Sequence, residues 1–221
     1  MKKIALVFTI ACASQLYGME PIKTEEEKAQ EAKALAIYTS PAILPELQQE
    51  IINKTLAVSK DYEEAVQMIE KFSFLHGMAF DKLFNLKDFT KLTHILADQF
   101  GVTTALIASE FNTPIAQTYR TLGYQLLDFA GDNRECAHNK MIGLIKQGAD
   151  ASFSAYKTPL ELAIEHHDLK GVQLLLDLGA KPTSQDLSVA KIEETWAEHW
   201  NQQSKEATIT IKNLIENAMK K

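Results

Sequence analysis

The sequence predicts an all-α protein, with a helical N-terminal region followed by a short array of helical hairpins. The 221 residues include only nine glycines and six prolines, too few for a typical all-β or disordered chain. Leu, Ala, Glu, Lys and Gln are abundant, and all are strong helix formers. Apolar residues recur three and four positions apart along most of the chain. The contents of 46% hydrophobic and 24% charged residues are ordinary for a globular protein.

Residues 1–18 have the pattern of a secretory signal peptide. Lys2 and Lys3 precede an apolar run over residues 4–11, which is too short to span a bilayer. Small residues then allow cleavage after Ala13 or after Gly18. The alternative is a buried N-terminal helix. We therefore expect a protein that is secreted or periplasmic, or else delivered to a host, with no stable membrane span after cleavage.

The charge of the mature chain argues against nucleic acid as a partner. Residues 1–18 carry two lysines and no acidic residue, so their removal leaves 21 basic and 29 acidic residues, a net charge of −8. Non-specific nucleic-acid binding needs a basic surface. Cys136 is the only cysteine left after cleavage, so stability must come from packing and not from an intramolecular disulfide.

Residues 19–40 are expected to form a charged linker, because Glu and Lys alternate there with almost no large apolar residue. Residues 41–123 are expected to form a helical domain of five or six helices that caps the hairpin array. Helix starts are indicated by N-capping residues and prolines. In chain order these expected starts are Leu44-Pro45, Asp61, Asp88, Thr103 and Thr113-Pro114.

The helix expected from Leu44 to Leu56 resembles the first helix of the F-box, a small module that docks on a ubiquitin-ligase adaptor. The likeness consists of the Leu-Pro start and later Ile and Leu positions. It implies an effector that recruits the adaptor inside a eukaryotic host, with Leu47 and Ile51 at the contact. The alternative is an ordinary packed helix.

Residues 158–180 contain the clearest pattern in the chain. Thr158 is a good N-cap and Pro159 suits the first helical position. An apolar face follows, then a polar break at residues 165–168, then a second apolar face. Gly179 suits a left-handed C-terminal cap. About 22 residues therefore predict two short antiparallel helices, a unit too small to bury its apolar side alone.

This unit resembles the ankyrin repeat. The family's T-P-L-x-L-A core is present at residues 158–163, and its L-L-L-x-x-G-A ending is present at residues 174–180. His167-Asp168 replaces the usual Gly-His, so the turn lacks its glycine. Glu161 replaces the usual His, which is expected to weaken the network between adjacent turns. The resemblance implies a scaffold that binds another protein, and a host protein is one candidate for this partner.

Copies of the pattern predict three repeats, over residues 124–154, 155–183 and, in degenerate form, 184–219. The upstream copy contains L-x-x-A at residues 127–130 and a Gly-Ala ending at residues 148–149. The downstream copy has L-x-x-A at residues 187–190 and Leu214-Ile215 in its second helix. We expect one continuous apolar spine, in which one repeat presses against the next. Its members would be Leu127, Ala130, Leu144, Ile145, Leu160, Ala163, Leu175 and Leu176.

The connection between the first two repeats, residues 150–157, is expected to be a β-hairpin-like finger. Phe153 and Tyr156 would lie near its tip, where aromatic side chains make good interface anchors. The alternative is that both pack against a neighbouring finger. The partner-binding residues expected on the finger and at the end of the inner helix are Phe153, Ser154, Tyr156, Glu165 and His166.

No catalytic or metal-binding constellation is evident, so we expect no enzyme, no cofactor and no metal. His166 and His167 are adjacent on a turn and would diverge, and Cys136 with His138 lacks a third ligand. An alternative is an enzyme whose pocket gathers His76, Asp81 and His94. Trp196 and Trp200 are expected to cover the last repeat; the alternative is a partner-binding stripe.

Overall fold

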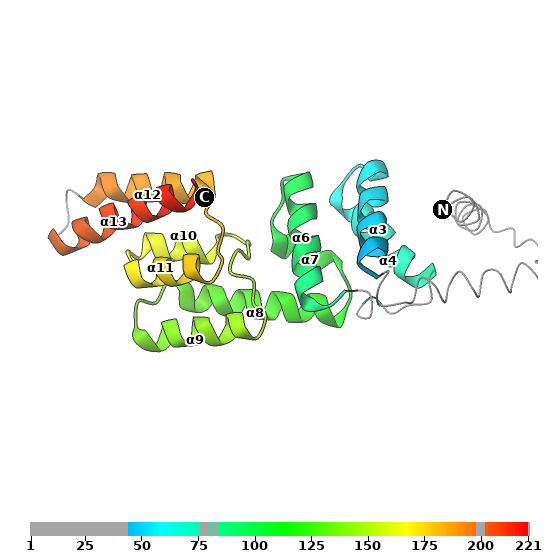
Figure 1. Cartoon of the computed structure of the whole chain (residues 1–221), viewed down its shortest axis with the longest axis horizontal. Coiled ribbons are helices and arrows are strands. Elements are labelled where there is room, and N and C mark those ends of the chain that lie inside the picture. The colour runs from blue at the N-terminus through cyan, green and yellow to red at the C-terminus, as the bar shows by residue number, and fades with distance from the viewer. Residues whose placement is uncertain (1–43, 76–79, 81–83, 198–201, 221) are drawn as a thin grey trace, which may run out of the picture.

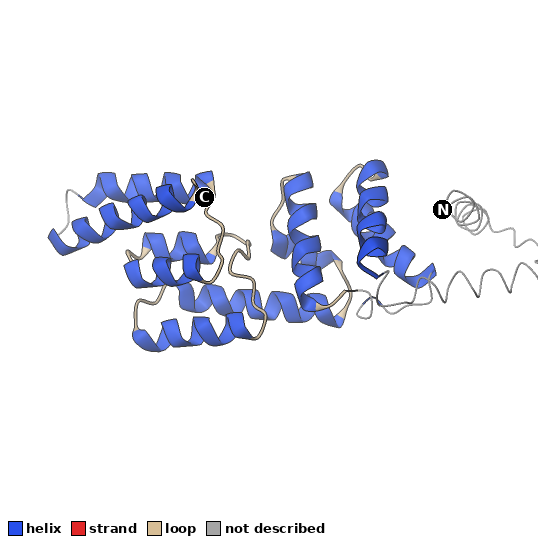
Figure 2. Cartoon of the chain, in the orientation of Figure 1, coloured by secondary structure: helices blue, strands red, loops and turns tan. Residues whose placement is uncertain are grey.

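A computed structural model describes residues 44–75, 80, 84–197 and 202–220. This part of the chain contains ten helices and no strand (Figure 2), which confirms the all-α prediction. The expected signal peptide and linker lie outside the described residues. None of the described helices has both the length and the apolar character to cross a bilayer.

The N-terminal half consists of α3 (Leu44–Val58), α4 (Tyr62–Leu75), α6 (Leu86–Phe100) and α7 (Thr104–Glu110). Helix α3 contacts α4, α4 contacts α7, and α7 contacts α6. An aromatic core joins these helices to the next one, because Phe89 of α6 packs edge-to-face on Tyr119, with 5.5 Å between ring centroids. The side chains of Leu47 and Ile51, the expected F-box-like contacts, lie outside the described residues.

The C-terminal half contains three helical hairpins, which Figure 1 shows as three stacked layers. Their helices in chain order are α8 (Pro114–Ala130) with α9 (Glu135–Lys146), α10 (Pro159–Glu165) with α11 (Leu169–Asp177), and α12 (Ser184–Trp196) with α13 (Gln202–Ala218). Helix α10 contacts both α8 and α12, and α11 contacts α13. The expected boundary between residues 123 and 124 falls inside α8.

Threonine side chains begin the first helix of each hairpin. Thr113, Thr158 and Thr183 each accept a hydrogen bond from a backbone N–H in the first turn. Pro114 and Pro159 occupy the first helical position, as predicted. These caps satisfy N–H groups that have no partner within the helix.

Two helix starts differ from the prediction. The cap of α6 is Asn85, whose side chain accepts a hydrogen bond from the N–H of Asp88, so Asp88 lies in the first turn. Both residues are good caps, and sequence alone does not rank two candidates three residues apart. The sequence also indicates that the final helix starts at Ser204, but helix α13 begins two residues earlier, at Gln202.

The turn between α10 and α11 contains no glycine, and a histidine adopts the left-handed conformation there instead. His167 adopts φ +53° and is the only described non-glycine residue with positive φ.

Glu161 accepts a hydrogen bond from the backbone N–H of Thr158, which completes a capping box. Thr158 Oγ1 also donates to Asp186 of the third hairpin at 3.3 Å, so a hydrogen bond does connect adjacent hairpins. Gly179 has φ +96°, which confirms its predicted left-handed conformation.

The apolar core consists of three clusters and not of the single spine expected. Leu127 belongs to the N-terminal aromatic cluster. Ala130 and Leu144 form a second cluster with Met141. The third lies in the second and third hairpins, where Leu160, Ala163 and Leu175 are buried. The half-buried side chains of Ile145 and Leu162 each pack against two clusters, so bridging contacts connect the layers.

Candidate functional site

The finger loop (residues 150–157) joins the first hairpin to the second and carries three of the five expected partner-binding residues. It contains no strand, so the expected β-hairpin-like form is wrong. A turn opens it, in which the N–H of Phe153 donates to the carbonyl of Asp150 at 3.0 Å. Three separate contacts then hold the loop against α6, α7 and α8.

The first contact is a cluster around the buried carboxylate of Asp150. His94 Nε2 lies 2.8 Å from Asp150 Oδ2, and the Tyr119 hydroxyl donates to the same oxygen at 2.7 Å. Burial, the largest single effect, acts to raise the pKa of Asp150, but the hydrogen bond and charge of His94 together with the hydrogen bonds from Tyr119 and the N–H of Ser152 outweigh it, so the pKa lies below its usual value. The same hydrogen bond raises the pKa of His94. Both shifts favour an ion pair at this end of the loop.

The second contact is the ring of Phe153, which is fully buried. It lies between Tyr119 and Tyr124 of α8, with ring centroids at 5.5 and 5.3 Å. A Cβ on Gly123 would lie 2.4 Å from this ring, so the absence of a side chain at residue 123 makes the space that Phe153 fills. The expectation that Phe153 is presented to a partner is therefore wrong, and the ring is an anchor of the loop.

The third contact is between Ser154 and the start of α7. The N–H of Ser154 donates to Thr104 Oγ1, and the N–H of Thr104 donates to Ser154 Oγ, both at 2.9 Å. The N–H of Ala105 donates to the carbonyl of Ser154 at 2.9 Å. The polar groups of Ser154 are thus engaged within the chain, which leaves it poorly suited to the partner contact that the sequence suggested.

Tyr156 differs from its neighbours in the loop because 74% of its surface is exposed. It lines a groove of about 350 Å³ between the finger loop and helices α7 and α8. We call this the Tyr156 groove; its lining includes Leu106, Ser109, Arg120, Tyr124, Ala155 and Tyr156. Leu106 and Tyr124 are also exposed. The buried Nε of Arg120 has no hydrogen-bond partner.

The other two expected residues lie at the end of α10. Glu165 forms a salt bridge with Lys157, which ties the base of the finger loop to the helix. His166 is exposed, and one side of its ring lies against Gly131 at the end of α8, where a Cβ would be 2.7 Å away. The structure therefore does not gather the five expected residues into one surface, and only Tyr156 is both strongly exposed and part of a groove.

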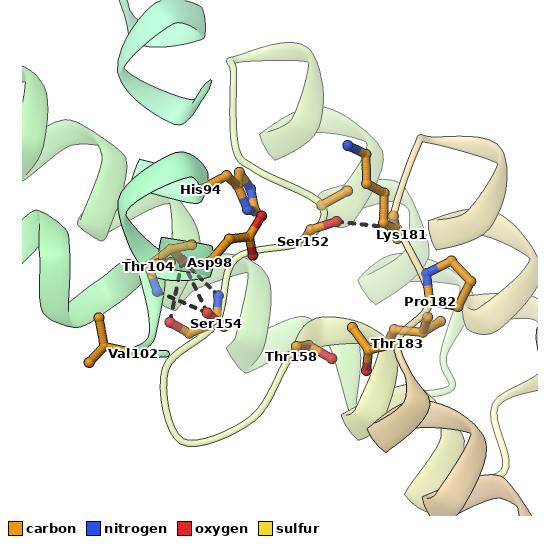
Figure 3. Close-up of a pocket in the computed structure, with 14 residues that line it drawn as sticks. His94, Asp98, Val102, Thr104, Ser152, Ser154, Thr158, Lys181, Pro182 and Thr183 are labelled. Carbon is orange, nitrogen blue, oxygen red and sulfur yellow. Dashed lines mark hydrogen bonds between the residues drawn. The ribbon is translucent and has the colours of Figure 1, made fainter. Parts of the chain in front are cut away.

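A second cavity, of about 320 Å³, lies between α6, the finger loop and the connection before α12 (Figure 3). Its lining combines polar and apolar side chains, and the polar ones include His94, Asp98, Ser152 and Lys181. At its rim the N–H of Lys181 donates to Ser152 Oγ at 2.9 Å. Sequence reasoning missed this cavity because its lining comes from three separate segments, within residues 94–104, 151–160 and 180–183.

A second histidine–aspartate pair joins the first and second hairpins. His138 Nε2 lies 2.7 Å from Asp168 Oδ2, and both side chains are buried. Asp168 also caps α11 by accepting a hydrogen bond from the N–H of Gly171 at 2.9 Å. A Cβ on Gly171 would lie 2.2 Å from the Asp168 carboxylate. The pair therefore fixes the start of α11 against α9.

The residues considered for metal binding or catalysis do not converge. Cys136 is exposed, whereas His138 is buried against Asp168. Among the described residues, no group of three or more His, Cys, Asp or Glu side chains is arranged to hold a metal. His76 and Asp81 lie outside the described residues, and their expected neighbour His94 pairs with Asp150.

Trp196 does not cover the last hairpin as expected, because 60% of its surface is exposed. Ile192, one turn earlier on α12, is exposed as well. Trp200 lies outside the described residues.

Comparison of the chain with protein-family models, with curated proteins and with solved structures found no match.

Proposed function

We propose that this chain is an exported protein-interaction module built from ankyrin-like repeats, in which the finger loop presents Tyr156 to another protein. Three stacked helical hairpins support the proposal, since stacked repeats give a rigid surface whose outer side chains are free to vary. The T-P-L-x-L-A core and its upstream and downstream copies support the ankyrin-like character. Export rests on the sequence of residues 1–18.

The observation that carries the proposal is the contrast between a fixed loop and an exposed aromatic side chain. Asp150, Phe153 and Ser154 are each held by contacts to other elements, whereas Tyr156 is 74% exposed. Binding through such a side chain costs little conformational entropy, because the backbone that carries it is already ordered. Tyrosine is also among the residues that contribute most to protein interfaces.

The test is affinity capture with the tagged chain and two variants. Tyr156→Ala removes the proposed anchor, and Ile192→Ala removes an exposed apolar side chain of α12 as a matched control. We expect one or more proteins to be retained by the wild type and by Ile192→Ala but lost with Tyr156→Ala, with the same melting temperature for all three. Equal capture by Tyr156→Ala and the wild type would contradict the proposal.

A further inference from the structure

The chemistry of the Tyr156 groove identifies the kind of partner. We infer that the groove binds an extended segment of a partner protein in which an Asp or Glu side chain lies next to an apolar side chain. The carboxylate pairs with Arg120, and the apolar side chain packs against Leu106 and Tyr156. This inference rests on the proposed function and adds the chemistry of the partner to it.

Charge is the first argument. Among the described residues, Arg120 is the only charged one that lines the groove, and no carboxylate lines it. This is unusual in a chain with a net charge of −6. The Nε of Arg120 is buried without a hydrogen-bond partner, and a buried donor left unpaired costs free energy. Arg120 as a whole is half-buried and lines the groove, and a guanidinium binds a carboxylate by two parallel hydrogen bonds, so an acidic side chain in the groove would pair with the accessible part of this side chain.

The apolar lining is the second argument. Leu106, Tyr124 and Tyr156 are all exposed large side chains, and they meet around the same groove. Exposed apolar side chains that gather at one place mark interaction sites more often than single ones do. Tyrosine and arginine together are the residue types most enriched at the centre of interfaces.

The shape of the groove is the third argument. It is open and not enclosed, and its volume of about 350 Å³ is near the lower end for a ligand site. A groove of this size takes a few side chains, and its open form lets a chain enter and leave. We therefore assign the carboxylate to a side chain within the segment and not to a chain terminus.

The polar groups of the rim are mostly used within the chain. Thr103 Oγ1 accepts a hydrogen bond from the N–H of Leu106 at 3.2 Å, and Ser109 Oγ donates to the carbonyl of Leu106 at 2.7 Å. Arg120 is therefore the main group left to select a partner. The resulting preference is for a negative charge flanked by an apolar residue.

The experiment is a selection from a displayed library of random heptapeptides, each held inside a carrier protein so that neither terminus is free. The bait is the full chain, as wild type, Arg120→Gln, Arg120→Lys, Tyr156→Ala and Arg134→Gln. Arg134 is a matched control, because it is an exposed arginine paired with Asp132 in a turn between α8 and α9. Circular dichroism verifies that each variant is folded.

We expect the wild type to select peptides with Asp or Glu next to an apolar residue. Affinity for a selected peptide should fall by about tenfold or more with Arg120→Gln, less with Arg120→Lys, and not at all with Arg134→Gln. Replacing the acidic residue of the peptide by its amide should weaken binding to the wild type but not to Arg120→Gln. That coupling would place the carboxylate on Arg120.

Two results overturn the inference but leave the proposed function intact. One is the selection of neutral peptides whose binding depends on Tyr156 but not on Arg120; the other is a wild-type chain that self-associates in sedimentation while Arg120→Gln stays monomeric, which would make a second copy the occupant. Peptide binding that is unaffected by Tyr156→Ala would instead contradict the proposed function itself.

Discussion

Two histidine–aspartate pairs connect distant parts of this molecule, and they differ mainly in their access to water. The His94–Asp150 pair has an N–O distance of 2.8 Å and side chains that are 33% and 7% exposed. The His138–Asp168 pair has a distance of 2.7 Å and side chains that are 3% and 4% exposed. The same contact thus occurs once at the edge of a cavity and once in the interior between two hairpins.

The difference determines what each pair contributes. A buried charged or polar pair adds little net stability when intact, but removing one partner leaves the other without compensation in a medium of low polarity. Within the part of the chain that the structure describes, the buried Nδ1 of His138 has no hydrogen-bond partner, so Asp168 is the one polar partner of this ring. His94, by contrast, lines the cavity of Figure 3. Water therefore has access to the His94–Asp150 pair, and screening by water reduces the energy of this contact.

The largest expected effect comes from breaking the buried pair. Asp168→Ala removes the partner of His138 and the cap of α11, so we expect the free energy of unfolding to fall by about 3–5 kcal/mol. Urea denaturation followed by circular dichroism measures it. Asp132→Ala, in the exposed pair with Arg134, is the control and should leave the midpoint nearly unchanged. A similar small shift for both variants would contradict the structural role of Asp168.

The next effect concerns Phe153, which holds the finger loop independently of the ion pair at Asp150. Phe153→Ala empties the space beside Gly123, so unfolding should become easier by about 3 kcal/mol or more. Thermal unfolding of Phe153→Ala and Tyr156→Ala gives the comparison, because Tyr156 is mostly exposed. Comparable losses of stability for the two variants would mean that Tyr156 belongs to the core and not to a binding surface.

A smaller effect tests the turn that places Asp168. His167 has φ +53°, a conformation that costs a residue with a side chain more than it costs glycine. His167→Gly and His167→Ala both lose the contact with Glu193 and differ only in this backbone cost. We expect the glycine variant to be more stable by about 1 kcal/mol. Equal stabilities in urea would show that the turn changes its conformation in the alanine variant.

The smallest effect is a pH dependence of the His94–Asp150 pair, in which only the histidine is partly exposed. The pKa of His94 is raised above 6.5 by its hydrogen bond with Asp150, so this contribution is complete below pH 6.5 and is lost as the pH rises through the folded-state pKa. The pKa of Asp150 is lowered below 3.8, so its contribution is present above pH 3.8 and is lost as the pH falls. The pair should therefore stabilise the fold most between these two values.

The free energy of unfolding, measured from pH 6 to pH 9 in the wild type and in His94→Gln, isolates the contribution of the His94–Asp150 pair. We expect the wild type to lose less than about 1 kcal/mol over that range relative to the variant. Parallel curves for the two proteins would mean that the pair does not titrate with folding.

The helices were predictable because their signals are local. The Thr-Pro starts of α8 and α10 and the left-handed Gly179 depend on residues within one turn of each other, so sequence alone reveals them. The position of Phe153 was not predictable in this way. It depends on the absence of a side chain at Gly123, which lies 30 residues earlier. Nothing in the sequence around this helical glycine indicates that a distant ring packs against it.

The candidate site shows the same limit. Tyr156 was identified from its expected place in the loop, but Arg120 and Leu106 were not, because the groove arises only when α7, α8 and the loop pack together. The His138–Asp168 pair likewise joins residues 30 positions apart, so the sequence offered Cys136 with His138 as a local pair instead. Tertiary contacts, and not helix propensity, decide which of these side chains have partners.

The division of the interior into three clusters has a consequence for how the molecule opens. Because the second and third hairpins share one cluster, and half-buried Leu86, Ile145 and Leu162 make the contacts between clusters, these two hairpins are expected to open together and apart from the first hairpin. Such a protein exposes its amides to deuterium in stages and not in a single cooperative event. The α12–α13 hairpin lies at one end of the stack and shares its cluster with α10 and α11, so the amides of these four helices are expected to exchange before those of α8.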